Sequence, residues 1–174
     1  MKDMPSTPAK GLVFTKVWKR EDPRDVLILR TAKHLSELRE DAVIATGSKR
    51  RAFQLLKLRP DLQIINIRGN VDTRLRKMEE QQLDGIVLAA AGLKRLGMED
   101  VITQYLAPED MISAPAQGAL ALEVREDQKE LQKMLDVFCD EETMNEVCAE
   151  RNFLEQMGGS CHTPAGARCQ KTDQ

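Results

Sequence analysis

The sequence is poor in aromatic residues and has almost no net charge. Phe, Trp and Tyr make up 3% of its 174 residues, so Leu, Ile, Val, Ala and Met must supply the core. The formal net charge of −2 gives no overall attraction to nucleic acid or to an anionic membrane. The longest apolar stretch, residues 85–93, is far shorter than the roughly 20 residues of a membrane-spanning helix. The composition therefore indicates a globular protein and excludes membrane-spanning, disordered and collagen-like classes.

Cysteine is absent from the first 138 residues, and the 4 cysteines that follow form no CxxC pair. The opening residues contain no apolar segment of the kind found in signal peptides. We therefore expect free thiols rather than a disulfide framework, and a cytoplasmic location. The spacing of Cys148, Cys161 and Cys169 fits no zinc pattern, so no metal site is predicted. Cys161 could be a core residue, a nucleophile or a covalent attachment point.

Alternating strand and helix patterns predict an α/β fold. The expected strands are 12–18, 42–46, 62–67, 84–90 and 118–125. One expected helix follows Ser48 as its N-cap and the next starts at Asn70. A short one ends at Gly97, and two more span about 127–138 and 141–157. The alternation of strands and helices within 42–97 is typical of βα units around a parallel sheet, while residues 21–25 are expected to form a connection.

Basic residues gather where these strands meet their helices. Cations in a first helical turn are normally disfavoured, so their presence after Ser48 indicates an anion there. In a parallel sheet these junctions lie at one edge, where ligands bind. Arginines converging on that edge predict a ligand with several carboxylates or phosphates, and a solvated basic surface is the alternative. The residues are Lys49, Arg50, Arg51, Arg68, Arg74, Lys94 and Arg95. The sequence contains no glycine-rich nucleotide-binding loop.

Seven motifs resemble, in order along the chain, the porphobilinogen deaminase family, also called hydroxymethylbilane synthases. They are MKDMP (1–5), REDPRD (20–25), TGSKRRAFQL (46–55), IRGNVDTRLRK (67–77), LAAAGLKRLG (88–97), PAQGALALEVR (115–125) and AERNFLEQMGGSCHTPAGA (149–167). The resemblance implies a transferase of heme (tetrapyrrole) biosynthesis that condenses four porphobilinogen molecules into hydroxymethylbilane and releases ammonia. It also implies a dipyrromethane cofactor, covalently attached to one cysteine through a thioether.

The resemblance implies a role for individual residues as well. Asp3 matches the catalytic aspartate, and Cys161 matches the cysteine that carries the cofactor. Arg95 and Gln117 match substrate-binding positions, and Gln117 also matches a residue at a domain hinge. The residues expected to hold the carboxylates of the cofactor are Lys2, Ser48, Arg50, Arg51, Arg68 and Arg74. The chemistry agrees with this assignment, because guanidinium groups suit carboxylates and a carboxylate stabilises the cation left when ammonia departs.

The family fold implied is three α/β domains, of which the first two are similar to periplasmic binding proteins. Residues 24–112 would form a complete second domain, and 1–23 with 113–138 an incomplete first domain. Residues 139–174 would begin a partial C-terminal α+β domain. Met1 lies inside the motif that contains Asp3, so we expect the first several dozen residues of the family to be missing. Gly47, Lys49 and Ser160 stand where the family commonly has serine, leucine and glycine.

Three functions follow from these observations. The leading expectation is a porphobilinogen-using transferase with neither a nucleic-acid nor a membrane partner. Family members are monomeric, but we expect this chain to need the missing N-terminal segment, whose absence leaves sheet edges unpaired. The alternative is a non-catalytic polycarboxylate-binding fragment of the same fold. Nucleic-acid binding is the weakest of the three, because the basic residues lack interleaved aromatic platforms.

Overall fold

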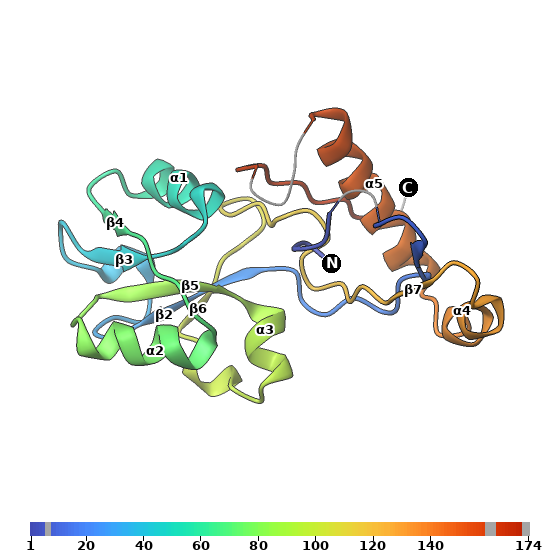
Figure 1. The fold of residues 1–174 in the computed structure, drawn as a ribbon. Coiled ribbons are helices and arrows are strands. Elements are labelled where there is room, and N and C mark those ends of the chain that lie inside the picture. Colours follow the sequence, from blue (N-terminus) through green and yellow to red (C-terminus); the bar gives the residue numbers. More distant parts are fainter. Residues whose placement is uncertain (6–7, 159–162, 172–174) are drawn as a thin grey trace. The chain divides into compact units, whose positions relative to one another are not determined.

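The chain forms two compact units in the computed structural model, which describes residues 1–5, 8–158 and 163–171 (Figure 1). Unit 1 combines Met1–Pro23 with Ser113–Gln174, and unit 2 is Arg24–Ile112. The assignment of these residues to three family domains stays a prediction. Within the described ranges, no helix has both the length and the apolar character needed to cross a membrane.

Unit 2 is built on a 5-stranded sheet with the strand order β4-β3-β5-β2-β6. Its strands are β2 (Asp25–Leu29), β3 (Val43–Ala45), β4 (Gln63–Ile65), β5 (Gly85–Ala89) and β6 (Gln104–Tyr105). The strand β3 is parallel to β4 and β5, as the βα pattern predicts. The sequence does not predict the strand β2, which is antiparallel to both β5 and β6 and makes the sheet as a whole mixed. It lies between β5 and β6, and every one of its residues is buried.

Three α-helices cover the two faces of this sheet: α1 (Lys49–Leu58), α2 (Val71–Glu80) and α3 (Ala90–Arg95). Figure 1 shows α1 on one face and α2 with α3 on the other. Neighbouring residues of β2 point to opposite faces, so Leu27 packs in the core with Leu55 of α1, and Val26 in the core with Leu93 of α3. Short 3₁₀ turns, η1 (Leu35–Glu37) and η2 (Glu99–Val101), lie in the connections.

The predicted N-cap at Ser48 and the predicted helix start at Asn70 are both confirmed. The Ser48 hydroxyl accepts a hydrogen bond from the Arg51 backbone N–H at 3.4 Å. The Asn70 side-chain oxygen accepts from the Thr73 N–H at 2.9 Å. Because these bonds satisfy N–H groups that the first helical turn leaves unpaired, they fix where α1 and α2 begin.

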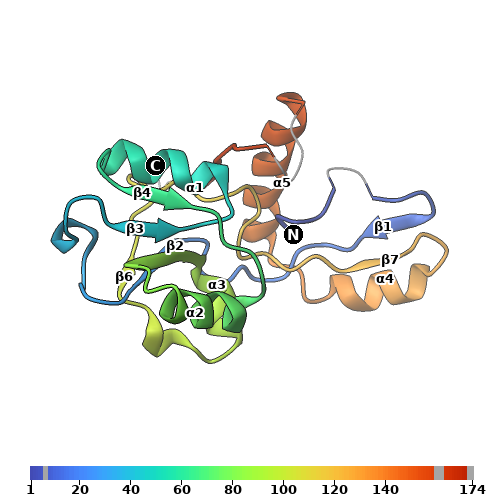
Figure 2. The ribbon, with the colours of Figure 1, turned by 60° about the vertical axis from the view of Figure 1, so that its left-hand side comes forward.

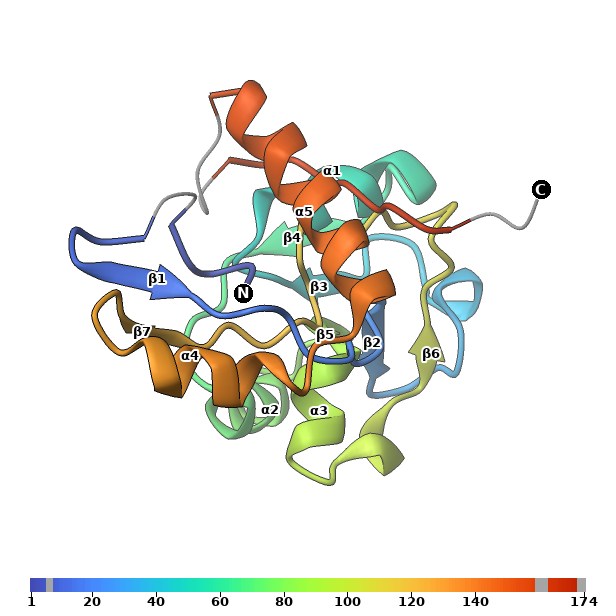
Figure 3. The ribbon, with the colours of Figure 1, turned by 90° about the vertical axis from the view of Figure 1, so that its right-hand side faces the viewer.

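Unit 1 contains a 2-stranded antiparallel sheet of β1 (Leu12–Phe14) and β7 (Glu123–Arg125). The helices α4 (Lys129–Asp136) and α5 (Glu141–Gln156) follow β7, as the sequence predicts. In Figures 2 and 3, α4 lies beside the β1–β7 pair. Both strands are shorter than expected. One further hydrogen bond, from the Thr15 N–H to the Leu122 carbonyl at 2.9 Å, continues the pairing, and later backbone groups find other partners. The Lys16 N–H, for example, donates to the Asp136 carboxylate at 2.8 Å.

Helix α4 buries none of its residues. Its large apolar side chains and those just beyond its end are exposed, with 65% of Met134, 78% of Val137 and 60% of Phe138 accessible to solvent. Several large exposed apolar side chains close together in the sequence are typical of a surface that another polypeptide contacts.

Candidate functional site

The cationic edge is the edge of the unit 2 sheet at which β3, β4 and β5 end. Each of these strands is followed by a helix that begins at this edge, so the helix N-termini point their N–H groups toward it. A Cβ atom on Gly47 would lie 2.9 Å from the carbonyl oxygen of Ile67. The glycine at this position therefore lets the β3–α1 turn lie directly against the backbone of the β4–α2 turn.

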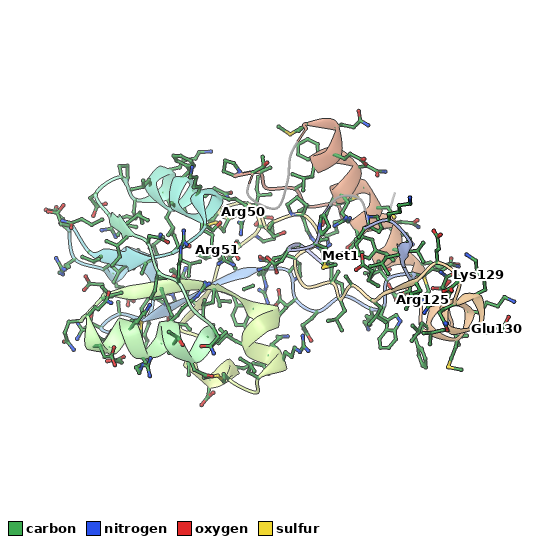
Figure 4. All side chains as sticks on the ribbon, viewed as in Figure 1. Met1, Arg50, Arg51, Arg125, Lys129 and Glu130 are labelled. Carbon is green, nitrogen blue, oxygen red and sulfur yellow. The ribbon has the colours of Figure 1, made fainter. Side chains whose placement is uncertain are left out.

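Arg50 and Arg51, in the first turn of α1, are buried against one carboxylate (Figure 4). The Arg51 Nε and Nη2 atoms donate to Asp25 Oδ1 at 3.0 and 2.7 Å. The Arg50 Nη1 atom lies 2.7 Å from Asp25 Oδ2 and donates to the Ile112 carbonyl at 2.5 Å. The Arg51 Nη1 atom donates to the Val87 carbonyl in β5 at 3.3 Å. The two guanidinium groups are thus fixed by partners from three different segments.

Asp25 reaches the cationic edge because β2 runs opposite to its neighbours. It is the first residue of β2 and pairs in register with Ala89, the last residue of β5. Its side chain is fully buried. The sequence analysis missed Asp25 because it assigned residues 21–25 to a connection. The signal that could have found it is an acidic residue directly before a short apolar run, which is typical of a buried strand.

Arg74, in the first turns of α2, adds another positive charge to the cationic edge. Its Nε atom donates to the Gly69 carbonyl at 2.8 Å, and Gly69 has a φ of 128° that favours glycine. Burial lowers the pKa of Arg74, and the positive charge of Arg51 lowers it further. The pKa of Arg50 is also lowered, first by burial and then by Arg51, although Asp25 opposes the shift. The positive charge of Arg51 therefore lowers the pKa of an arginine at the start of each of the two helices.

The other two arginines predicted for the site, Arg68 and Arg95, are exposed. Arg68 is exposed in the β4–α2 turn, and its carbonyl accepts from Lys77 Nζ at 3.1 Å. Arg95 is the last residue of α3, at the end that lies away from the cationic edge, and it is exposed. The structure therefore brings together Ser48, Arg50, Arg51 and Arg74, with Arg68 in the adjoining turn.

In unit 1, two of the predicted site residues contact each other. The Lys2 Nζ atom donates to Gln117 Oε1 at 3.2 Å. Gln117 is buried, and its amide donates to the Pro23 carbonyl at 2.6 Å. Asp3, next to Lys2, is exposed. The structure thus anchors the chain just before Asp3, with this carboxylate left accessible to solvent.

A buried ion-pair network that the sequence analysis missed joins α5 to the rest of unit 1. Arg20 forms a two-pronged pair with Glu150, and both N–O distances are 2.9 Å. The Glu150 carboxylate also accepts from the Ala116 and Cys169 N–H groups at 2.7 and 2.9 Å. Glu146 pairs with Arg20 at 3.4 Å and with Arg168 at 3.3 Å. The partners are too far apart in sequence for a local pattern to reveal them.

Cys161, the expected attachment point of the cofactor, lies outside the described residues, as does His162 beside it. The cysteines within the described ranges, Cys139, Cys148 and Cys169, are not in disulfides. In that part of the chain no group of three or more His, Cys, Asp or Glu side chains is placed to hold a metal ion.

Comparison with known proteins identifies the family of this chain. A family model described as "Porphobilinogen deaminase, dipyromethane cofactor binding domain" matches residues 1–133. The porphobilinogen deaminase of Lachnospira eligens is 57% identical over 175 residues, which cover 99% of this chain and 59% of that protein. The enzyme of Clostridioides difficile is 53% identical over 171 residues, which cover 98% of this chain and 57% of that protein. The chain therefore spans somewhat more than half the length of these relatives.

A solved structure of a Bacillus subtilis lipoprotein has a TM-score of 0.50 to this chain at 11% sequence identity. The match covers 92% of this chain and 70% of that one. At so low an identity the likeness concerns the fold alone, and it agrees with the mixed α/β architecture. The family match over most of the chain and the high identity to named relatives lead to one conclusion. This chain belongs to the porphobilinogen deaminase family.

Proposed function

We propose that this chain provides the cofactor-binding part of a hydroxymethylbilane synthase. The complete protein would condense four porphobilinogen molecules into hydroxymethylbilane, with release of ammonia, on a dipyrromethane primer attached to Cys161. In this proposal residues 24–112 form a periplasmic-binding-protein-like domain. Residues 1–23 with 113–138 form an incomplete first domain, and 139–174 begin the third. We also propose a cytoplasmic location, which the free thiols of the described cysteines support.

The observation that carries the proposal is the convergence of Arg50, Arg51 and Arg74 at the cationic edge. Asp25 is the carboxylate that pairs with Arg50 and Arg51, so the three guanidinium groups leave an excess of positive charge there. A pyrrole with acetate and propionate side chains offers carboxylates that can bind such groups with charge-assisted hydrogen bonds. The donor set of this edge therefore fits the dipyrromethane, with Ser48, Arg68 and Lys2 as further proposed contacts.

The chain's own residues suggest how the reaction is promoted. The dipyrromethane, when bound, supplies the pyrrole carbon to which substrate units are added. Arg95 and Gln117 are proposed to orient porphobilinogen, and the exposed Asp3 to hydrogen-bond its aminomethyl group. In its protonated, ammonium form that group would lose neutral ammonia, with the electron pair of the C–N bond leaving on nitrogen. The Asp3 carboxylate would stabilise the cation that remains on the substrate. Asp3 is also proposed as the group that would accept the proton released by the pyrrole carbon of the bound primer.

Mass spectrometry of the purified chain tests the proposal. Incubation with porphobilinogen is expected to add the mass of a dipyrromethane to Cys161 and to give colour with Ehrlich's reagent, and a Cys161→Ser variant is expected to show neither. If the mass of the wild-type chain does not change, either alone or with the N-terminal segment of a relative added in trans, the proposal is wrong.

A non-catalytic polycarboxylate-binding fragment is the second candidate. It is favoured by the exposed apolar face of α4 and by the 2-stranded sheet of unit 1, which is too small to be stable by itself. The N-terminal segment of a relative, added in trans, separates the two candidates. Restored tetrapyrrole synthesis supports the enzyme, whereas carboxylate binding without synthesis supports the fragment.

A further inference from the structure

The pairing of Arg50 and Arg51 with Asp25 raises the question of what a buried carboxylate does at an anion-binding edge. A carboxylate competes with carboxylate ligands for the same N–H donors, and its burial carries a desolvation cost. Asp25 is fully buried and occupies the Nε and Nη2 donors of Arg51. A sheet that needed only a stable core would place an apolar residue at this position.

We infer that Asp25 is a positioning residue that fixes the planes of the Arg50 and Arg51 guanidinium groups for carboxylate binding. The inference rests on the proposed function, because it assumes that the cationic edge binds carboxylates. Asp25 acts through the arginines and does not contact the ligand itself.

The geometry supports this role in two ways. Arg51 donates from Nε and Nη2 to one oxygen of Asp25 and from Nη1 to the Val87 carbonyl, so neither rotation nor tilting of its guanidinium plane is free. Arg50 is held by the second oxygen of Asp25 and by the Ile112 carbonyl. Because a bidentate contact with a carboxylate depends on the guanidinium plane, fixed planes favour one orientation of the ligand.

Asp84 offers a matched control within the same sheet. It is also a buried aspartate with an arginine partner, and its Oδ2 accepts from Arg39 Nη2 and from the Val43 N–H, both at 2.8 Å. It directly precedes Gly85, the first residue of β5, so it lies at the opposite edge from Asp25. An Asp84→Asn change therefore removes a comparable buried charge without touching the cationic edge.

The test compares the whole chain with its Asp25→Asn and Asp84→Asn variants. The first readout is the guanidinium ¹⁵N NMR spectrum, in which hindered rotation gives separate Nη signals for Arg51. The second is the affinity for porphobilinogen, measured by calorimetric titration. We expect Asp25→Asn to merge the Arg51 signals and to weaken binding by about tenfold, the factor carried by a hydrogen bond to a charged group. Asp84→Asn should do neither, although it lowers the urea midpoint.

Two results would overturn the inference: unchanged affinity in Asp25→Asn, or an equal loss of affinity in Asp84→Asn. If the wild-type chain binds no porphobilinogen, the proposed function fails. The NMR comparison still tests whether Asp25 fixes the guanidinium plane of Arg51, because Arg51 signals that stay separate in Asp25→Asn contradict that role. If Asp25→Asn does not fold, Asp25→Glu keeps the charge and shifts the carboxylate by one methylene group. Wild-type affinity in Asp25→Glu would then refute the inference.

Discussion

Arg20 and Glu150 form a two-pronged ion pair inside unit 1, with both N–O distances at 2.9 Å and both side chains almost fully buried. Glu150 belongs to α5, and Arg20 belongs to the segment that precedes unit 2. The pair therefore joins segments from the two ends of the chain within one unit.

Replacing Arg20 by Met is expected to destabilise unit 1 strongly. The change leaves the Glu150 carboxylate buried without its main counter-ion, which costs about 3–5 kcal/mol of unfolding free energy. Trp18 is the single tryptophan of the chain and lies in unit 1, so its fluorescence during urea unfolding reports on this unit.

Arg125→Met is the control for this prediction. Arg125 also forms an ion pair, with Asp127, but both of those side chains are exposed. Solvent screens such a pair, so we expect little change in the urea midpoint. Equal effects of the two substitutions would show that burial does not determine the strength of the Arg20–Glu150 pair.

Arg74→Gln is expected to weaken porphobilinogen binding by about tenfold while leaving the urea midpoint nearly unchanged. Arg74 is partly exposed at the cationic edge, and its Nε atom bonds a carbonyl rather than a carboxylate, so its loss leaves no buried charge behind. Arg76→Gln is the matched control, because Arg76 lies on the same helix and pairs with the exposed Glu80 at 3.5 Å. Calorimetric titration measures both variants. Equal weakening by Arg76→Gln would point to general charge attraction instead of a site.

The carboxyl group of Asp61 is expected to titrate near pH 2. Hydrogen bonds from Arg59 Nε and Nη2, at 2.8 and 2.6 Å, lower the pKa of Asp61 from 3.8 to about 2. A depressed folded-state pKa means that this contact stabilises the fold above pH 3.8, and that the contribution is lost as the pH falls through 2.

A ¹³C NMR titration of the Asp61 carboxyl checks this value. Arg59→Gln removes the donors and is expected to return the midpoint toward 3.8, the ordinary value for Asp61. Lys57→Gln removes a positive charge from the last turn of α1 without breaking these hydrogen bonds and should leave the midpoint low. A wild-type midpoint close to the ordinary value would contradict the pairing.

The exposed face of α4 is expected to make the chain associate with itself at high concentration. Replacing both Met134 and Val137 by Lys should reduce this association, because both side chains are largely exposed and their loss opens no cavity. Light scattering over a range of concentrations measures the mass. Lys133→Glu on the same helix is the control and should leave the association unchanged. A wild-type chain that stays monomeric throughout would show that the face is too small to bind.

Local features of unit 2 could be predicted from the sequence, but features that depend on distant residues could not. Ser48 and Asn70 identify the starts of α1 and α2 because an N-cap acts within one turn. The strand β2 was missed because its direction and place depend on β5 and β6, which follow much later in the chain.

In the candidate site, too, local features could be predicted and contacts between distant residues could not. The strand–helix order places Arg50, Arg51 and Arg74 near one edge of the sheet, since parallel strands end together. That Arg50 and Arg51 are buried against Asp25 could not be predicted, because their partner enters from an antiparallel strand. The role of Cys161 stays a prediction, because this residue lies outside the described part of the chain.

The position of β2 beside β6 has a consequence for protein engineering. The Asp25 carbonyl accepts a hydrogen bond from the Leu106 N–H at 3.0 Å. The start of β2, the first strand of unit 2, therefore lies beside the end of β6, which is its last strand. A segment whose ends are neighbours can be excised, or closed into a ring by a short linker, without pulling its sheet apart. Residues 24–112 are thus a segment that can be moved into another protein together with its arginine cluster.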